Sequence, residues 1–196
     1  MKNQTKRHAF RLLALSFFVS LIGCLPTYVG DPEKAVLDPA LIGIWHKADQ
    51  DQDDFWAVHK MNDHCYLVQA YIIRPREDGK RALDATMTSR AWLTPIGGQT
   101  FISLEIFAME ALLKPEAEAA KIRYLVAKLV MGKNGVTIQA LNPDFLKNKP
   151  VTTPAELEKV IAENIDSPTL LTEKAVYTRV DRENADKFKA LLDLIK

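Results

Sequence analysis

The chain is poor in the residues and motifs that usually reveal an activity. Its 196 residues include two cysteines and four histidines. It has no Gly-x-Ser-x-Gly elbow, no phosphate-binding glycine loop and no Cys-x-x-Cys pair, which leaves hydrolase, nucleotide-binding and dithiol chemistry without support. No apolar run reaches the roughly 20 residues that a transmembrane helix needs. The sequence therefore predicts a protein that is not an enzyme, with no cofactor and no permanent membrane-spanning helix.

The first 24 residues have the order of charge and hydropathy that is typical of an export signal. Four basic residues and no acidic one precede the apolar run 12–22: Lys2, Lys6, Arg7 and Arg11. Eleven helical residues span about 16 Å, well short of a hydrocarbon core of about 30 Å. The segment is thus predicted to direct export and then to be removed.

The end of this segment, Leu21-Ile22-Gly23-Cys24, resembles the lipobox of bacterial lipoproteins. The resemblance implies that the peptide 1–23 is cleaved between Gly23 and Cys24, and that Cys24 carries the acyl chains, palmitate among them. Two or three such chains anchor a protein stably to a bilayer, whereas one binds only reversibly. Leu25 stands where an aspartate would retain the protein in the inner membrane, so the resemblance implies the outer membrane, facing the periplasm.

Cleavage would leave a single domain of ordinary size on a short tether. Residues 25–40 contain Pro26, Gly30, Pro32 and Pro39 without a sustained period, which predicts that residues 24–40 are a lipidated cysteine and a linker. Fully extended, the linker would reach about 50 Å. Without residues 1–23 the chain has 22 basic and 25 acidic residues, a formal charge of −3, which offers no footprint for nucleic acid. Cys65, in an apolar run, is predicted to be a buried thiol.

The domain 41–196 reads mainly as β-strands. Alternating or β-branched runs predict strands at 41–46, 55–61, 65–73, 82–93, 100–107, 122–131, 136–141 and 175–180. Asn134-Gly135 between two such runs predicts a hairpin. The segment 109–120 is compatible with a helical or an irregular excursion.

Two helices are predicted late in the chain. Thr153, Pro154 and Glu156 form a capping box with proline at the first helical position, and Asp181 is predicted to cap a terminal helix. A long antiparallel sheet hides its edges by closing. We therefore predict a mainly β fold: a small antiparallel barrel of about eight strands, closed or incomplete, whose first and last strands meet and whose open end carries a helix.

Gly43-Ile44-Trp45 in the first predicted strand resembles the Gly-x-Trp signature of lipocalins and lipocalin-like barrels. The resemblance implies that Trp45 plugs one end of the barrel and that a basic residue from the last strand, Arg179 or Arg182, packs over its ring. Such a contact contributes about 0.5–2 kcal/mol. The second lipocalin signature, Thr-Asp-Tyr, does not occur in the chain.

Candidate metal ligands are present but poorly spaced. Asp49, Asp51 and Asp53 copy half of a calcium loop, yet Asp54 and Lys60 occupy the positions of its glycine and its bidentate glutamate. The histidines of the mature chain, His46, His59 and His64, lack the helical spacing of a zinc motif. No metal site is predicted.

Carboxylates and aromatic residues leave two interpretations open. Nothing in the sequence pairs Glu105, Glu110, Glu116 and Glu118 across a substrate. The aromatic residues Trp56, Tyr66, Tyr71, Trp92, Phe101 and Phe107 either fill the barrel core or line a pocket. The sequence thus predicts a lipid-anchored periplasmic protein that binds an apolar small molecule or an envelope component; the alternative is a protein–protein interaction or assembly factor without a cavity.

Overall fold

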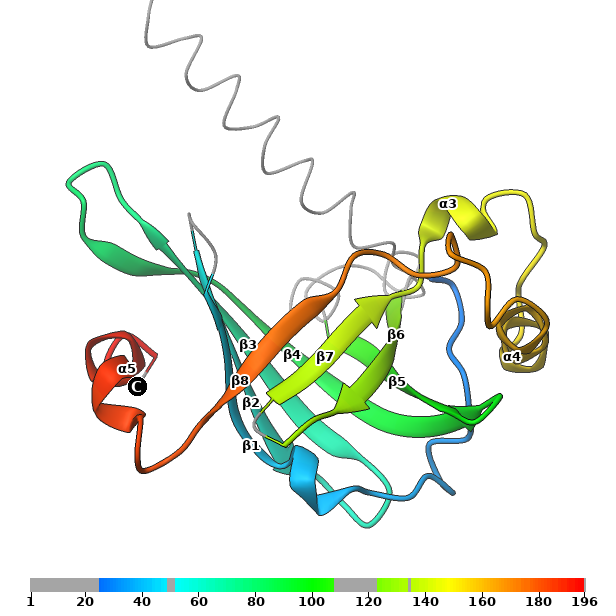
Figure 1. Ribbon diagram of the computed structural model, residues 1–196, viewed down its shortest axis with the longest axis horizontal. Coiled ribbons are helices and arrows are strands. Elements are labelled where there is room, and N and C mark those ends of the chain that lie inside the picture. The colour runs from blue at the N-terminus through cyan, green and yellow to red at the C-terminus, as the bar shows by residue number, and fades with distance from the viewer. Residues whose placement is uncertain (1–24, 49–51, 108–122, 134, 196) are drawn as a thin grey trace, which may run out of the picture.

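The structure, a computed structural model, describes residues 25–48, 52–107, 123–133 and 135–195. A single antiparallel sheet dominates it (Figure 1). Its strands are β1 (Gly43–Ala48), β2 (Asp53–Lys60), β3 (Tyr66–Pro75), β4 (Arg81–Ile96), β5 (Gln99–Phe107), β6 (Arg123–Met131), β7 (Gly135–Ala140) and β8 (Ala175–Val180). The helices described are η1 (Pro39–Leu41), α3 (Pro143–Leu146), α4 (Pro154–Glu163) and α5 (Ala185–Leu192).

The sheet closes into a barrel in which each strand pairs with the next along the chain and β8 pairs with β1. Closure places Ile44 opposite Val180 and Trp45 opposite Arg179, so the first and last strands meet. The predicted mainly β fold and eight-stranded antiparallel barrel are confirmed, and the barrel is closed rather than incomplete. Closure leaves no free sheet edge.

The β6–β7 hairpin shows why glycine follows Asn134 in the sequence. The amide of Gly132 donates to the carbonyl of Gly135 across 2.8 Å. A Cβ atom on Gly135 would lie 2.8 Å from the carbonyl oxygen of Tyr177 in β8. Only glycine therefore lets β8 approach the start of β7 closely enough to pair with it.

The strands separate one apolar cluster on the inner face of the sheet from two on its outer face. Because side chains alternate along a strand, Trp45, Val68, Leu104 and Leu129 share the inner face, whereas Val126 and its neighbours share the outer one. The inner residues include Leu41, Trp45, Val58, Tyr66, Val68, Ala91, Ile102, Leu104, Leu125, Ala127, Leu129, Val136, Ile138 and Tyr177. These side chains form a packed core inside the barrel.

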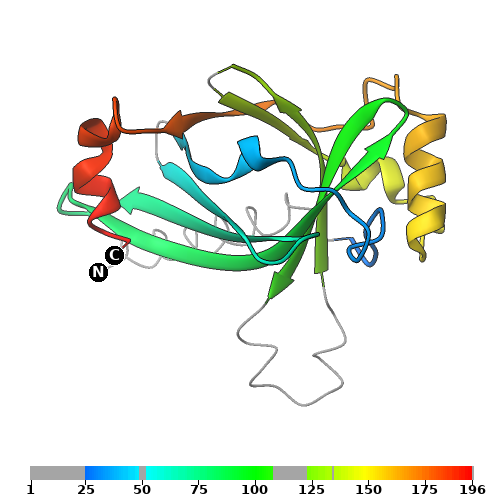
Figure 2. The same ribbon diagram turned by 90° about the horizontal axis from the view of Figure 1, so that it is seen from below.

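The segment that precedes β1 lies on the barrel wall instead of reaching away from it (Figure 2). Leu25 pairs with Tyr124 of β6 through two backbone hydrogen bonds of 2.7 and 3.1 Å. Val29 is fully buried, and its carbonyl accepts three hydrogen bonds from the side chains of Trp92, Thr94 and Ser103. Residues 25–40 therefore differ from the predicted linker, because buried contacts outside their own sequence hold them.

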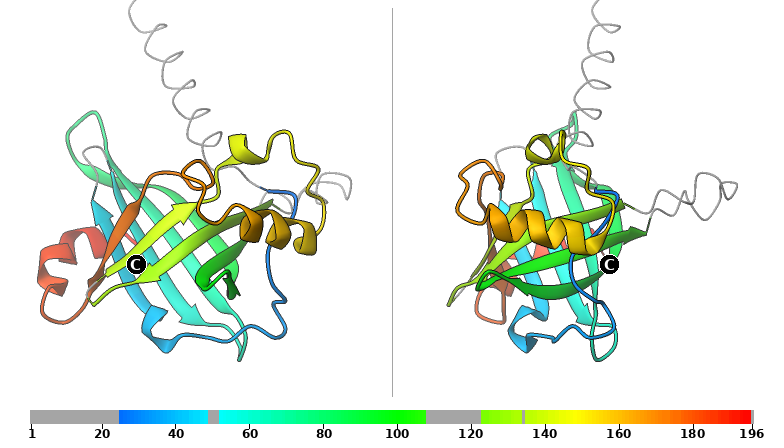
Figure 3. Two further views of the ribbon diagram at one scale, coloured as in Figure 1. Left: turned by 45° about the vertical axis from the view of Figure 1, so that its right-hand side comes forward. Right: turned by 90° about the vertical axis from the view of Figure 1, so that its right-hand side faces the viewer.

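Helix α4 covers the outer wall rather than an end of the barrel, which corrects the prediction of a helix at an open end (Figure 3). Leu157 and Ile161 are fully buried among outer-face residues such as Phe101 and Val126. The predicted capping box is present: the hydroxyl of Thr153 accepts from the amide of Glu156, whose carboxylate accepts from the amide of Thr153. The apolar face of α4 thus packs on the outer face of β5 and β6 and shields it from solvent.

Helix α5 packs on the outside of β1 and β2. The ring centroid of Phe188 lies 4.5 Å from that of His46 and 6.0 Å from that of Phe55. The predicted cap is wrong by three residues: the helix begins after Asn184, and Asp181 instead accepts from the amides of Glu183 and Asn184 in the preceding turn. Within the residues described, no helix has the length and hydropathy needed to cross a membrane.

Candidate functional site

One end of the barrel, called here the plugged end, is closed by Trp45 and η1. Trp45 is 3 % exposed, and its indole nitrogen donates to the carbonyl of Leu41 across 2.8 Å. The hydroxyl of Tyr66 contacts both the amide and the carbonyl of Asp38, which caps η1. Two inner residues, Trp45 and Tyr66, thus hold the segment that precedes β1, residues 25–42 and named here the entry segment, across the barrel end.

Arg179 stacks on the plug from the last strand. Its guanidinium carbon lies 5.2 Å from the centroid of the Trp45 ring, and its two terminal nitrogens donate to the carbonyls of Ala40 and Ile42 across 2.9 and 2.8 Å. A Cβ atom on Gly43, whose φ is +147°, would lie 3.0 Å from the guanidinium. Glycine at this position therefore makes room for Arg179.

The opposite end of the barrel interior carries polar and aromatic side chains. The pairing register places Lys47 opposite Asp54, and Trp56 opposite Trp45, so all of them share the inner face. The rings of Trp56 and Tyr177 meet at a centroid distance of 5.1 Å. Lys47, Asp54, Trp56 and Tyr177, named here the inner cluster, therefore lie above the plug.

Several inner-cluster residues are partly exposed although they face the interior. Lys47, Asp54 and Trp56 all retain partial solvent access, unlike the fully enclosed core below them. Across the barrel from Trp56, the same face carries the small Ala70 and the partly exposed Met87. Solvent thus reaches both charged and apolar side chains of the inner face at this end of the barrel.

Ser89 adds an unsatisfied polar group to this half of the interior. It lies opposite Val68 and Ile106 on the inner face and is fully buried. Among the residues that the structure describes, its hydroxyl has no hydrogen-bond partner. A buried hydroxyl without a partner costs about 1–3 kcal/mol.

Tyr177 is the inner-cluster residue whose titration is clearly perturbed. Burial raises the pKa of the Tyr177 hydroxyl, and the nearby carboxylate of Asp54 raises that pKa further. The phenol consequently stays protonated at neutral pH and acts as a hydrogen-bond donor or acceptor. A general base would instead need a pKa near the working pH.

His46 belongs to an ion cluster on the outer wall, not to a metal site. Its Nε2 lies 2.7 Å from Oδ1 of Asp53, and the other carboxylate oxygen of Asp53 pairs with Arg81. Burial lowers the pKa of His46, Arg81 lowers it further, and Asp54 opposes both. The neutral imidazole therefore donates to Asp53.

The other candidate metal ligands do not converge in the part of the chain that can be described. No group of three or more ligating side chains occurs among those residues. His59 is exposed on β2, and the Nδ1 of His64 donates to the carbonyl of Ala35 across 2.9 Å. Asp49 and Asp51 fall outside the described residues.

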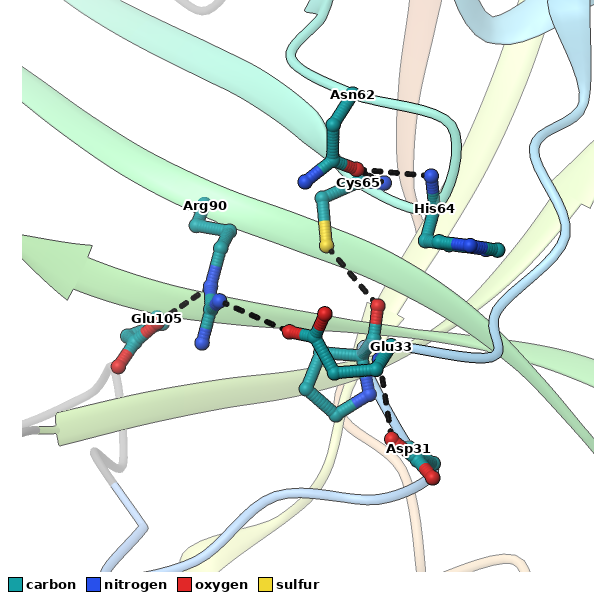
Figure 4. A network of polar contacts seen from close by, with 8 residues as sticks. Asp31, Glu33, Asn62, His64, Cys65, Arg90 and Glu105 are labelled. Atoms are coloured by element: carbon teal, nitrogen blue, oxygen red, sulfur yellow. Dashed lines mark hydrogen bonds and ion pairs between the residues drawn. The ribbon is translucent and has the colours of Figure 1, made fainter.

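Cys65 and Arg90 hold the entry segment to the outer wall (Figure 4). The thiol of Cys65 is buried and donates to the carbonyl of Pro32 across 3.3 Å, and burial raises the pKa of the thiol. Arg90 pairs with Glu105 at 2.8 Å and with Glu33 at 3.8 Å. The prediction of a buried Cys65 is confirmed, and these contacts are structural.

The aromatic residues divide between the two interpretations that the sequence left open. Tyr66 fills the inner core and Trp92 and Phe101 the outer clusters, whereas Trp56 faces the accessible interior. Tyr71 is partly buried on the outer face of β3, and Phe107 is 42 % exposed. Sequence reasoning singled out Trp56 but missed the residues that join it in the inner cluster, although Lys47 and Asp54 interrupt otherwise apolar inner positions.

Several residues singled out in the sequence lie outside the described residues. They include the cleavage residue Gly23, the lipidation residue Cys24 and three of the four glutamates, Glu110, Glu116 and Glu118. The fourth, Glu105, is paired with Arg90.

Comparison with known proteins identifies no relative: no family model matches the chain, and no curated protein or solved structure matches it either.

Proposed function

We propose that the mature chain is a lipoprotein, held by acylated Cys24 at the periplasmic face of the outer membrane, whose barrel interior binds an apolar small molecule without transforming it. The proposal of ligand binding rests on one observation: Trp56 on the inner face is partly exposed to solvent, whereas Trp45 closes the other end of the barrel. An eight-stranded barrel has room for side chains or for one small ligand.

The chemistry of this inner face defines the ligand class. Trp56, Ala70 and Met87 offer apolar walls, and the unpartnered hydroxyl of Ser89 offers one hydrogen bond. Ligand sites combine such a mainly apolar lining with a few placed polar groups. The best fit is therefore a slender apolar molecule that carries one polar group.

The anchor half rests on the lipobox resemblance and on the position of Leu25. Leu25 pairs with the start of β6, after the connection from β5. The same end of the barrel carries the β1–β2 connection beside the inner cluster. The proposed lipid would thus emerge at the end through which the interior is accessible, where an apolar ligand can be exchanged with the bilayer.

Mass spectrometry tests both halves on the chain made with its own signal. The intact mass should show loss of residues 1–23 and addition of acyl chains, and Cys24→Ser should abolish both. Native spectra should show a noncovalent apolar molecule that solvent extraction removes. An unprocessed wild-type chain would refute the anchor, and a chain that neither carries nor takes up such a molecule would refute the ligand.

One surface feature favours the alternative of an interaction factor. Val130, Thr137 and Val176 are neighbours across β6, β7 and β8 on the outer face, and the two valines are 48 % and 59 % exposed. Exposed apolar rows mark docking sites when they are extensive. A photo-crosslinker at position 176 should then capture one envelope protein in intact cells. A crosslinker at the position of the exposed Glu183 should not capture that protein, and equal capture at both positions would refute this alternative.

A further inference from the structure

An apolar hollow lies on the outside of the barrel beside Leu25. Its volume is about 130 Å³, below the roughly 300–1,000 Å³ of sites for drug-sized ligands, so it has room for only part of a long alkyl chain. Its lining comes from the entry segment, the α3–α4 connection and α4: Leu25, Pro26, Thr27, Leu146, Lys149, Val151 and Leu157. The hollow is separate from the barrel interior, because these residues belong to the outer cluster or border it.

The floor of the hollow is preformed. Leu157 is fully buried and Leu146 is 9 % exposed, and both pack in the outer cluster with Phe101 and Val126. Val151 packs against the same cluster from the connection before α4. The side chains therefore present a fixed apolar surface that needs no rearrangement to receive a hydrocarbon.

The covalent chain leads the proposed anchor directly to this hollow. Leu25 lines it and is fixed by its two backbone hydrogen bonds to Tyr124. Cys24 is bonded directly to Leu25, and consecutive Cα atoms of a chain are generally about 3.8 Å apart. A substituent on the sulfur of Cys24 thus starts beside the lining rather than at the end of a long linker.

We infer that the hollow holds part of one acyl chain of the lipid carried by Cys24, an inference that rests on the proposed lipidation. The lining is a hydrocarbon surface suited to a flexible alkyl chain. Lys149 stands at the hollow with its ammonium 4.6 Å from the ring centroid of Phe145, where it can meet the ester oxygens of the lipid.

The attached chain is favoured over other apolar occupants for two reasons. A short covalent link gives it a high effective concentration at the hollow, which a free phospholipid lacks. Two chains suffice for stable anchoring, so a triacylated cysteine can place its third chain in the protein without losing the membrane. The barrel is then held against the bilayer in one orientation.

Photo-crosslinking of the acyl chains tests this inference. Cells that produce the full chain with its own signal are fed a fatty acid bearing a diazirine, and the purified lipoprotein is irradiated, digested and mapped. We expect crosslinks from the Cys24 lipopeptide to peptides containing Leu146, Val151 or Leu157. Val151→Trp should fill the hollow and lower these crosslinks several-fold, whereas the matched Val176→Trp on the exposed face of β8 should leave them unchanged.

The outcomes separate this inference from the proposed function. A lipidated wild-type chain whose crosslinks reach only detergent or lipid overturns the inference alone, as does a Val151→Trp chain that folds and crosslinks as the wild type does. A Cys24 that carries no acyl chain overturns both the anchor and the inference. Circular dichroism of each variant verifies that the barrel is intact.

Discussion

Replacing Arg179 with alanine removes the residue that ties the last strand to the plugged end. The guanidinium donates to the carbonyls of Ala40 and Ile42 and stacks on Trp45. Without it, β8 loses its side-chain contacts with the entry segment, and the partly buried carbonyl of Ile42 loses its donor. We expect the whole barrel to be destabilised, because β8 closes it.

The expected loss follows from the individual contacts. A hydrogen bond from a charged donor to a partly buried acceptor contributes about 1.5 kcal/mol, while water replaces much of the contact at the exposed Ala40. The cation–π contact adds about 0.5–1 kcal/mol. The free energy of unfolding should thus fall by about 2–3 kcal/mol, which for a chain of this size lowers Tm by about 4–12 °C.

Urea unfolding followed by tryptophan fluorescence measures this loss. Arg179→Lys should retain only part of the stability, since an ammonium cannot donate to both carbonyls in the fixed geometry of a guanidinium. Arg182→Ala, on the exposed neighbour beyond β8, is the matched control and should change little. A loss below about 0.5 kcal/mol for Arg179→Ala would refute the assignment of the plug.

Three further predictions concern the outer wall. Burial lowers the pKa of His46 in the folded protein, so the unfolded chain binds a proton at higher pH, and the free energy of unfolding should fall as the pH drops below about 6.5. Urea titrations at several pH values should show this dependence reduced in His46→Gln and kept in the variant of the exposed His59, His59→Gln. Equal pH dependence in the two variants would contradict the prediction. Thr153→Ala should destabilise α4 by about 1 kcal/mol and speed amide exchange there, unlike Thr169→Ala in the following loop. Cys65, buried and with a raised pKa, should react with iodoacetamide far more slowly in the native protein than in urea, and equal rates would exclude its burial.

The strands were predictable because their signals are local and repeated, whereas the sequence left open whether the barrel closes. Alternation along 82–93 and the Asn134-Gly135 turn indicated β4 and the β6–β7 hairpin within a few residues. The 175–180 strand was predicted with its observed bounds. Each of these predictions depends on a two-residue alternation or on a turn residue, and both can be seen in the sequence itself.

The placement of residues 25–40 was not predictable, because its cause lies far along the chain. Proline and glycine in this stretch read as a linker, yet the carbonyl of Val29 accepts from Trp92, Thr94 and Ser103, more than 60 residues away. Gly30 is required for the same reason: a Cβ atom there would lie 2.0 Å from the hydroxyl oxygen of Thr94. Composition cannot show such tertiary contacts.

The inner cluster was hidden for a similar reason. Lys47 and Asp54 flank a polar turn, and Tyr177 stands more than 100 residues later. Only the closure of β8 on β1 brings the Tyr177 ring against that of Trp56. The site was thus inaccessible to reasoning from spacing, although every strand that builds it was identified.

Fluorescence quenching tests the central claim, an apolar ligand site at Trp56, most directly. A fatty acid brominated along its chain should quench the tryptophan fluorescence of the native protein along a saturable curve. Trp56→Phe should lose this saturable component while retaining the emission of Trp45 and Trp92, which lie in packed clusters. Absence of saturable quenching in the wild-type protein, or its persistence in Trp56→Phe, would contradict the claim.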